Sequence, residues 1–300
     1  MIDPKAIVSY AQYSEDIILL ALLYDVKKGF YIDVGANYPT TDSVTKLFYI
    51  KGWHGINIEP IESLYKELCK ERPRDINLKI GISDKCGFAT FKEYSDLPGH
   101  STFDLHSNKN DEKLRYKSYK IKVDTLNQVF IDNKIKHVNF LKIDVEGYEY
   151  NVVSGNNWKI NRPEIVCIEA NHINKDWRSK LLDNDYKLFI NDGLNEYYVR
   201  DESWYRIEGF AERAIDIAYH SLRQHQAEGW DNDSNNLTFL TKQVESLDKY
   251  NKQLSKQLNS MVTQLALSES LTLKNKSLRQ RIKRSAHGLT VDWVRFKKKK

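Results

Sequence analysis

Short apolar runs alternate along the first 200 residues with segments in which apolar side chains recur at helical spacing. The runs are rich in Val, Ile, Phe and Tyr, which is typical of buried strands, and the amphipathic segments between them predict helices. This alternation predicts an α/β fold with a mostly parallel sheet covered by helices on both faces. The expected strands are residues 30–34, 55–58, 76–80, 137–143, 164–169 and 187–190. The expected helices are residues 14–26, 42–51, 61–72, 125–132, 148–154 and 174–183.

Two segments depart from this alternation. Residues 87–123 are polar and rich in Ser, Lys, Asn and Tyr, so we expect an added hairpin and a mobile loop of the kind that covers substrates on α/β scaffolds. The last short run, residues 196–200, could close the sheet as an antiparallel edge strand.

The pattern changes after about residue 205. Residues 206–230 predict a linking helix, and residues 237–278 predict a coiled coil, because apolar residues recur there at alternating spacings of three and four. Asn251 at a core position would favour a parallel dimer, so we expect a homo-oligomer; one amphipathic helix packed on the domain is the alternative. The core positions are Leu237, Leu240, Val244, Leu247, Asn251, Leu254, Leu258, Met261 and Leu265.

The charge is concentrated at the end of the chain. Residues 279–300 contain nine of the 46 Lys and Arg residues and one of the 41 acids, so the rest of the chain has a net charge of −3 (37 basic, 40 acidic). This basic aromatic tail could contact an anionic membrane surface, or it could be solvated. A nucleic-acid partner is unexpected, because the rest of the chain is mildly acidic and has no recognisable RNA-binding module.

The N-terminal segment and the cysteines limit the cellular setting. No run of about 18 apolar residues predicts a membrane span. The first residues carry acids where a signal peptide would be basic, so we expect a cytoplasmic protein, peripheral at the inner membrane surface if the tail binds there. Three widely spaced cysteines indicate neither a disulfide framework nor a zinc site.

Polar residues follow the strands expected at 30–34 and 55–58. Asp33, Gly35 and Asn37 could bring a backbone loop close to a ligand, and Glu59 has the spacing of an acid that binds ribose hydroxyls. The G-x-G-x-x-G motif is missing, which favours a nucleoside without a pyrophosphate. An ordinary turn after the first strand, and a helix cap at Glu59, are the structural alternatives.

Two acids also follow the strand expected at 137–143. Asp144 and Glu146 lie two residues apart, so both could face the same crevice and anchor a substrate, accept a proton or hold a divalent metal. Helix capping by these carboxylates is the alternative.

Together, the segments "YIDVGAN", "GINIEP", "VDTL" and "LKIDVEGYEYNVVSG" resemble the FkbM family of S-adenosylmethionine-dependent methyltransferases. The resemblance covers about residues 8–200, within a domain that we expect to span residues 1–205. It implies a class I methyltransferase fold, which is Rossmann-like, with a seven-stranded sheet whose last strand is antiparallel. It also implies methyl transfer to a hydroxyl group, commonly of a sugar or a natural product.

The resemblance assigns roles to particular residues. Asp33, Gly35 and Asn37 match the loop that holds the methionine end of S-adenosylmethionine, and Glu59 matches the acid on its ribose. Ser83 and Asp84 match the adenine site. The lead-in segment "YAQYSEDIILL" matches at Gln12 and Asp16, which would close over the cofactor.

The chemistry of methyl transfer to a hydroxyl group suggests further candidates. The sulfonium is a strong electrophile, so the protein must align the acceptor oxygen and remove its proton. The candidate catalytic residues are Asp144, Glu146, His100 and His172, and a divalent metal such as Mg²⁺ could be held by Asp144, Glu169 and His172.

Three functions follow from these features. We expect an O-methyltransferase acting on a sugar or glycan, for example a lipid-linked or cell-surface polysaccharide. A non-catalytic scaffold working through the coiled coil and an RNA methyltransferase are the alternatives.

Overall fold

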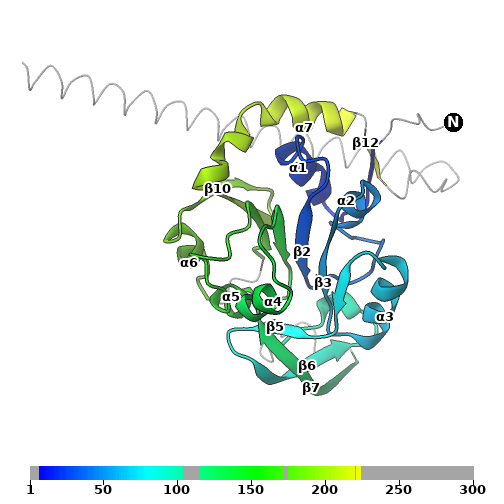
Figure 1. Cartoon of the computed structure of the whole chain (residues 1–300). Coiled ribbons are helices and arrows are strands. Elements are labelled where there is room, and N and C mark those ends of the chain that lie inside the picture. The colour runs from blue at the N-terminus through cyan, green and yellow to red at the C-terminus, as the bar shows by residue number, and fades with distance from the viewer. Residues whose placement is uncertain (1–6, 104–114, 172–174, 220, 224–300) are drawn as a thin grey trace, which may run out of the picture. The chain divides into compact units, whose positions relative to one another are not determined.

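A computed structural model describes residues 7–103, 115–171, 175–219 and 221–223 of the chain. At its centre is a seven-stranded sheet in the order β10-β11-β9-β8-β2-β3-β4 (Figure 1). Every neighbouring pair is parallel except the two pairs that β11 makes, so the predicted mostly parallel sheet is confirmed. The strands are β2 (Phe30–Val34), β3 (His54–Ile58), β4 (Ile76–Leu78), β8 (Phe140–Ile143), β9 (Ile165–Glu169), β10 (Tyr186–Asn191) and β11 (Asn195–Arg200).

Helices connect the strands and cover the sheet. One core cluster joins Ile32, Leu141 and Val166 of the central strands to Val129 of α4 and Val152 of α5. Burying an aliphatic side chain of this size contributes about 1.5–3 kcal/mol, so these contacts hold the helices on the sheet. The described helices are α1 (Glu15–Leu22), α2 (Lys46–Ile50), α3 (Glu62–Glu71), α4 (Leu126–Asp132), α5 (Glu149–Ser154), α6 (Arg178–Leu182) and α7 (Phe210–Tyr219), with 3-10 turns η1 (Pro98–His100) and η3 (Asp201–Ile207).

The other face of the sheet is covered by aromatic side chains. Tyr31 of β2 stacks on Phe140 of β8 with 5.6 Å between ring centroids, and Phe48 of α2 packs on Phe140 at 4.8 Å. Adjacent residues of a strand point to opposite faces, so Tyr31 and Ile32 anchor the two layers from one strand. The sheet is therefore covered on both faces, as its apolar strands predict.

The position of β11 corrects one prediction. Residues 196–200 do not form the edge of the sheet; β11 lies between β9 and β10, antiparallel to both. Tyr197 and Tyr198 of β11 are fully buried, whereas Lys187 and Leu188 of β10 are exposed. The strand with the more buried side chains, β11, therefore lies inside the sheet, and the more exposed β10 forms its edge.

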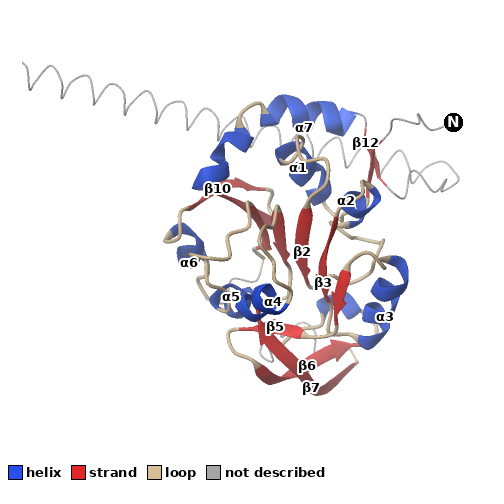
Figure 2. Cartoon of the chain, viewed as in Figure 1, coloured by secondary structure: helices blue, strands red, loops and turns tan. Residues whose placement is uncertain are grey.

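The polar segment after β4 forms a separate three-stranded sheet. β5 (Gly81–Ser83), β7 (Tyr116–Thr125) and β6 (Gly87–Tyr94) pair in that order, with β6 and β7 antiparallel as the predicted hairpin requires. This sheet lies at one end of the central sheet, at the bottom in Figure 2. The predicted mobile loop lies between β6 and β7 and includes residues 104–114, which fall outside the described residues.

Residues 206–223 pack on the domain, where the sequence predicts a linker. Helix α7 lies beside α1 (Figure 1), and the short strand β12 (Ser221–Arg223) pairs in parallel with β1 (Ile7–Ser9), so the helix predicted there ends at Tyr219. The buried guanidinium of Arg206 also pairs with Glu164 at the start of β9. The predicted coiled coil (237–278) and basic tail (279–300) lie outside the described residues. Within the described part, no helix combines the length and apolar character needed to cross a membrane.

Candidate functional site

A cavity of about 400 Å³ opens where β2, β3 and β8 end. These strands are parallel neighbours, with Val34 in register with Ile58 on one side and with Ile143 on the other, so the residues that follow them meet at one edge of the sheet. Segments 80–82 and 96–101 also line the cavity. Eight of the predicted site residues line it, namely Gln12, Asp33, Gly35, Asn37, Glu59, His100, Asp144 and Glu146.

Asp33 has one carboxyl oxygen for which the described residues supply no hydrogen-bond partner. Its Oδ2 accepts a hydrogen bond from the Thr45 hydroxyl at 2.9 Å, whereas its Oδ1 is buried and has no hydrogen-bond partner. Burial raises the pKa of Asp33, and the nearby Lys142 ammonium opposes this shift. A buried acceptor without a donor costs about 1–3 kcal/mol, so Asp33 Oδ1 is suited to a ligand that brings a donor.

Gly35 lines the cavity and is also required by the neighbouring strand. Its φ is +82°, and a Cβ at this position would lie 1.8 Å from the carbonyl oxygen of Asp144. The N–H of Gly35 donates to the Ile58 carbonyl oxygen at 3.0 Å. The loop is therefore held between β3 and β8, and the backbone of Asp144 excludes a side chain at this position.

Asn37 and Glu59 are joined by a hydrogen bond across the cavity wall. Asn37 adopts the predicted left-handed conformation (φ 51°), and its N–H donates to Glu59 Oε2 at 2.8 Å. Glu59 Oε1 accepts from the N–H of Ile61 at 2.8 Å. Burial raises the pKa of Glu59 to about 7, although both N–H groups stabilise its charged form. The side-chain oxygen of Asn37 is a second buried acceptor without a hydrogen-bond partner.

Three predicted cofactor residues do not line this cavity. The buried Asp16 accepts hydrogen bonds from the Ser9 hydroxyl (2.7 Å) and the Tyr10 N–H (2.8 Å), so it stabilises the turn before α1. Ser83 hydrogen-bonds the Tyr148 hydroxyl and Asp84, at 3.1 Å each. Ile80, Gly81 and Ile82, which precede Ser83, line the cavity instead.

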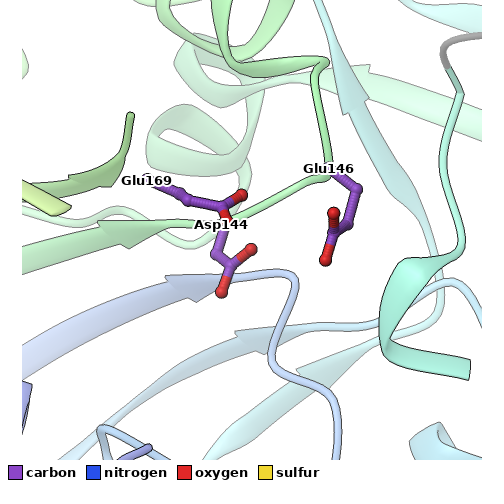
Figure 3. A group of neighbouring side chains, drawn as sticks. All are labelled: Asp144, Glu146 and Glu169. Carbon is purple, nitrogen blue, oxygen red and sulfur yellow. The ribbon is translucent and has the colours of Figure 1, made fainter. Parts of the chain in front are cut away.

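Acidic side chains gather where β8 and β9 end (Figure 3). Asp144, Glu146 and Glu169 each have a carboxyl oxygen within 4.8 Å of the other two. The ammonium of Lys142 lies 2.8 Å from Asp144 Oδ2. Asp144 and Glu169 of the predicted metal set are thus neighbours, joined by Glu146; His172, the third member of that set and a candidate base, lies outside the described residues.

The comparisons with known proteins concern this same region. A family model described as "Methyltransferase FkbM domain" matches residues 33–188, just over half of the chain. The chain belongs to this family. It is therefore an S-adenosylmethionine-dependent methyltransferase, as the sequence motifs predict.

Two other comparisons were with curated proteins and with solved structures. The comparison with curated proteins gives no match. A solved structure described as "a putative RNA methyltransferase PH1948 from Pyrococcus horikoshii" is 8% identical, with a TM-score of 0.32, over 63% of this chain and 82% of that chain.

In this FkbM methyltransferase, the candidate set inferred from the sequence omits two residues that shape the site. Burial lowers the pKa of the Lys142 ammonium, but Asp144 and Asp33 outweigh burial and raise it above its ordinary value. A lysine inside an apolar strand was the available signal. Glu149 Oε1 accepts the N–H groups of Val145 (3.2 Å) and Gly147 (3.1 Å), which fixes the loop that carries Glu146. An acid in the first turn of α5 was the signal for this second role.

Proposed function

We propose that this FkbM methyltransferase transfers the methyl group of S-adenosylmethionine to a hydroxyl group of a sugar or glycan. The observation that carries the proposal is the pair of buried acceptor oxygens without partners, Asp33 Oδ1 and Asn37 Oδ1, in a cavity that also contains Glu59. The α-ammonium group of S-adenosylmethionine supplies donors for such acceptors, and its ribose hydroxyls supply donors for a carboxylate.

The other side of the cavity suits a hydroxyl acceptor. Asp144 lines it with a side chain that is 36% exposed, and His100 and Ser101 of the segment after β6 line it as well. Polar side chains around a small cavity match an acceptor that carries several hydroxyl groups. Apolar contacts come from Phe91 and Phe103.

The proposed reaction is an in-line displacement. A lone pair of the acceptor oxygen forms the O–CH₃ bond while the electron pair of the S–CH₃ bond returns to sulfur, which leaves S-adenosylhomocysteine. The hydroxyl proton passes to a base, for which Asp144, Glu146 and His100 are the described candidates. The cavity contributes chiefly by holding the sulfonium and the hydroxyl oxygen in line.

The first test is a calorimetric titration of S-adenosylmethionine into the full chain. We expect Asp33→Asn and Glu59→Gln each to weaken binding at least about tenfold, which corresponds to 1.4 kcal/mol. Glu62→Gln is the matched control, because Glu62 is exposed on α3, pairs with Lys66 at 3.1 Å and does not line the cavity. A folded wild-type chain that does not bind would reject the proposal and favour the scaffold alternative.

The second test identifies the acceptor. Methyl transfer from isotopically labelled S-adenosylmethionine is measured with sugar nucleotides, glycans and RNA as acceptors. We expect label in a sugar or glycan product that survives mild alkali, because a methyl ether resists the base that hydrolyses a methyl ester. Label that enters RNA alone would contradict the proposed acceptor class.

A further inference from the structure

The backbone after β8 brings three carboxylates to one place. Asp144 directly follows β8, and Glu169 ends the adjacent parallel strand β9, where Ile143 is in register with Ile168. Glu146 lies two residues after Asp144; it adopts a left-handed conformation (φ 53°), and Gly147 continues the turn (φ 92°). A left-handed conformation at a non-glycine residue costs about 1–2 kcal/mol, so the fold maintains this turn against a local cost.

Glu169 differs from an ordinary surface acid. It is 8% exposed, and its Oε2 is buried without a hydrogen-bond partner, while the side-chain amide of Asn171 lies 3.5 Å from its Oε1. Burial raises the pKa of Glu169, and the neighbouring charges of Asp144 and Glu146 raise it further. The Lys142 ammonium, which opposes this rise, contacts Asp144 Oδ2. Among the described residues, this buried oxygen beside two other carboxylates therefore has no hydrogen-bond donor.

The spacing of the oxygens suits one small, hard cation. Two ligand oxygens on opposite sides of one ion lie about 4 Å apart for Mg²⁺ and about 5 Å apart for Ca²⁺. The three carboxylates offer oxygens within 4.8 Å of one another, so small side-chain rotations bring them into range. Their all-oxygen chemistry favours Mg²⁺, Mn²⁺ or Ca²⁺ over zinc or copper.

We propose that Asp144, Glu146 and Glu169 bind one divalent cation of the Mg²⁺ or Mn²⁺ type at the wall of the cavity. Asp144 and Glu146 line the cavity, so the remaining coordination positions of the cation face the substrate. This inference rests on the proposed function in one respect: the acceptor hydroxyl would occupy one of those positions. Coordination lowers the pKa of a bound hydroxyl group, whose proton then passes more readily to a base such as His100. Glu146 joins Asp144 and Glu169 of the set predicted from the sequence, whereas His172 lies outside the described residues.

The competing explanation is a proton shared within the cluster. A protonated Glu169 could donate a hydrogen bond to a neighbouring carboxylate, which would satisfy the cluster without a cation. The two explanations differ in what added metal does to the protein. A cation site binds metal with defined stoichiometry, whereas a shared proton predicts no such binding.

The experiment uses the full chain after treatment with a chelator and removal of that chelator. Binding of Mn²⁺ is followed by the loss of the electron paramagnetic resonance signal of the free ion, with Mg²⁺ and then Ca²⁺ as competitors. We expect one Mn²⁺ per chain in the micromolar to submillimolar range, displaced by Mg²⁺. Glu169→Gln and Glu146→Gln should each weaken binding at least about tenfold, or 1.4 kcal/mol. Glu62→Gln should bind like the wild type.

Circular dichroism shows whether each variant folds. Glu169 is buried and Glu146 is half-buried, so the test can still be read if one of the two variants does not fold. Wild-type protein that binds no Mn²⁺, or that keeps its affinity in both folded variants, would overturn the proposed cation site. S-adenosylmethionine is titrated into the same samples without metal. Intact cofactor binding with no metal binding rejects only the cation site, and loss of both rejects the proposed function as well.

Discussion

Acidic residues lie at the ends of β2 and β3 and at the ends of β8 and β9, but the groups around them differ between these two halves of the site. In the half made by β2 and β3, both oxygens of Glu59 accept backbone N–H groups, and one oxygen of Asp33 accepts the Thr45 hydroxyl. In the half made by β8 and β9, Asp144 and Glu169 lie beside Glu146 and the charges repel one another. The first half is thus prearranged by donors of the protein, and the second brings three carboxylates together beside the Lys142 ammonium.

This difference teaches that acidic residues after parallel strands can have different environments, even when they occupy equivalent positions in the fold. The strand end decides where the carboxylate lies, but the groups packed against it decide whether it is satisfied. The following substitutions test the contrast, beginning with the contact that joins the two halves.

Gly35→Ala should have the largest effect. The added methyl group would overlap the Asp144 carbonyl oxygen, which lies 1.8 Å from the Cβ position, and the residue would keep an unfavourable φ. We expect a loss of about 2–5 kcal/mol in the free energy of unfolding, from about 1–2 kcal/mol of left-handed strain and about 1–3 kcal/mol of overpacking. Chemical denaturation of both proteins measures it.

Gly193→Ala is the matched control for this substitution. Gly193 also has a positive φ (+102°), but no atom lies within 4 Å of its Cβ position, so only the strain of about 1–2 kcal/mol remains. Equal losses in the two variants would show that the contact between the halves contributes nothing.

Glu149→Gln should change how stability depends on pH. Burial raises the pKa of Glu149 to about 7 in the folded chain, against an ordinary value of 4.5, although its N–H partners lower it. The folded state therefore binds the extra proton between about pH 4.5 and 7, and the wild type loses stability as pH rises through this window. The loss is on the order of 3 kcal/mol at most.

Urea denaturation at pH 5 and pH 8 measures this slope. The Gln variant keeps an oxygen for the N–H groups of Val145 and Gly147 and has no proton to lose, so its stability should change less between the two pH values. An unchanged slope in the variant would show that Glu149 titrates normally in the folded state.

Ser83→Ala should have the smallest effect on the cofactor. The Ser83 hydroxyl bonds Tyr148 and Asp84 and does not line the cavity, so we expect the affinity for S-adenosylmethionine to change by less than about threefold. The lost hydrogen bonds should reduce stability by about 1 kcal/mol. An affinity at least tenfold weaker in calorimetry would instead support the adenine contact that the family resemblance implies.

The strands and helices of the domain were predictable because their signal is local. The apolar run at Tyr31–Ile32 and the amphipathic segment of α3 each encode their own geometry through side-chain periodicity. The place of β11 was not predictable, because it depends on which strand has a partner on both sides. Residues 221–223 likewise form a strand and not a helix because they pair with β1, which lies more than 200 residues earlier in the chain.

The candidate site divides in the same way. The sequence by itself determined that Asp33, Glu59 and Asp144 share one edge, because the ends of adjacent parallel strands must meet there. Only the tertiary structure decided that Gly35 packs on Asp144, that Glu169 joins Glu146, and that Asp16 is turned away from the cavity. The physical reason is that periodicity is a property of neighbouring residues, whereas the donors, charges and close contacts around a buried carboxylate come from segments that are distant in the chain.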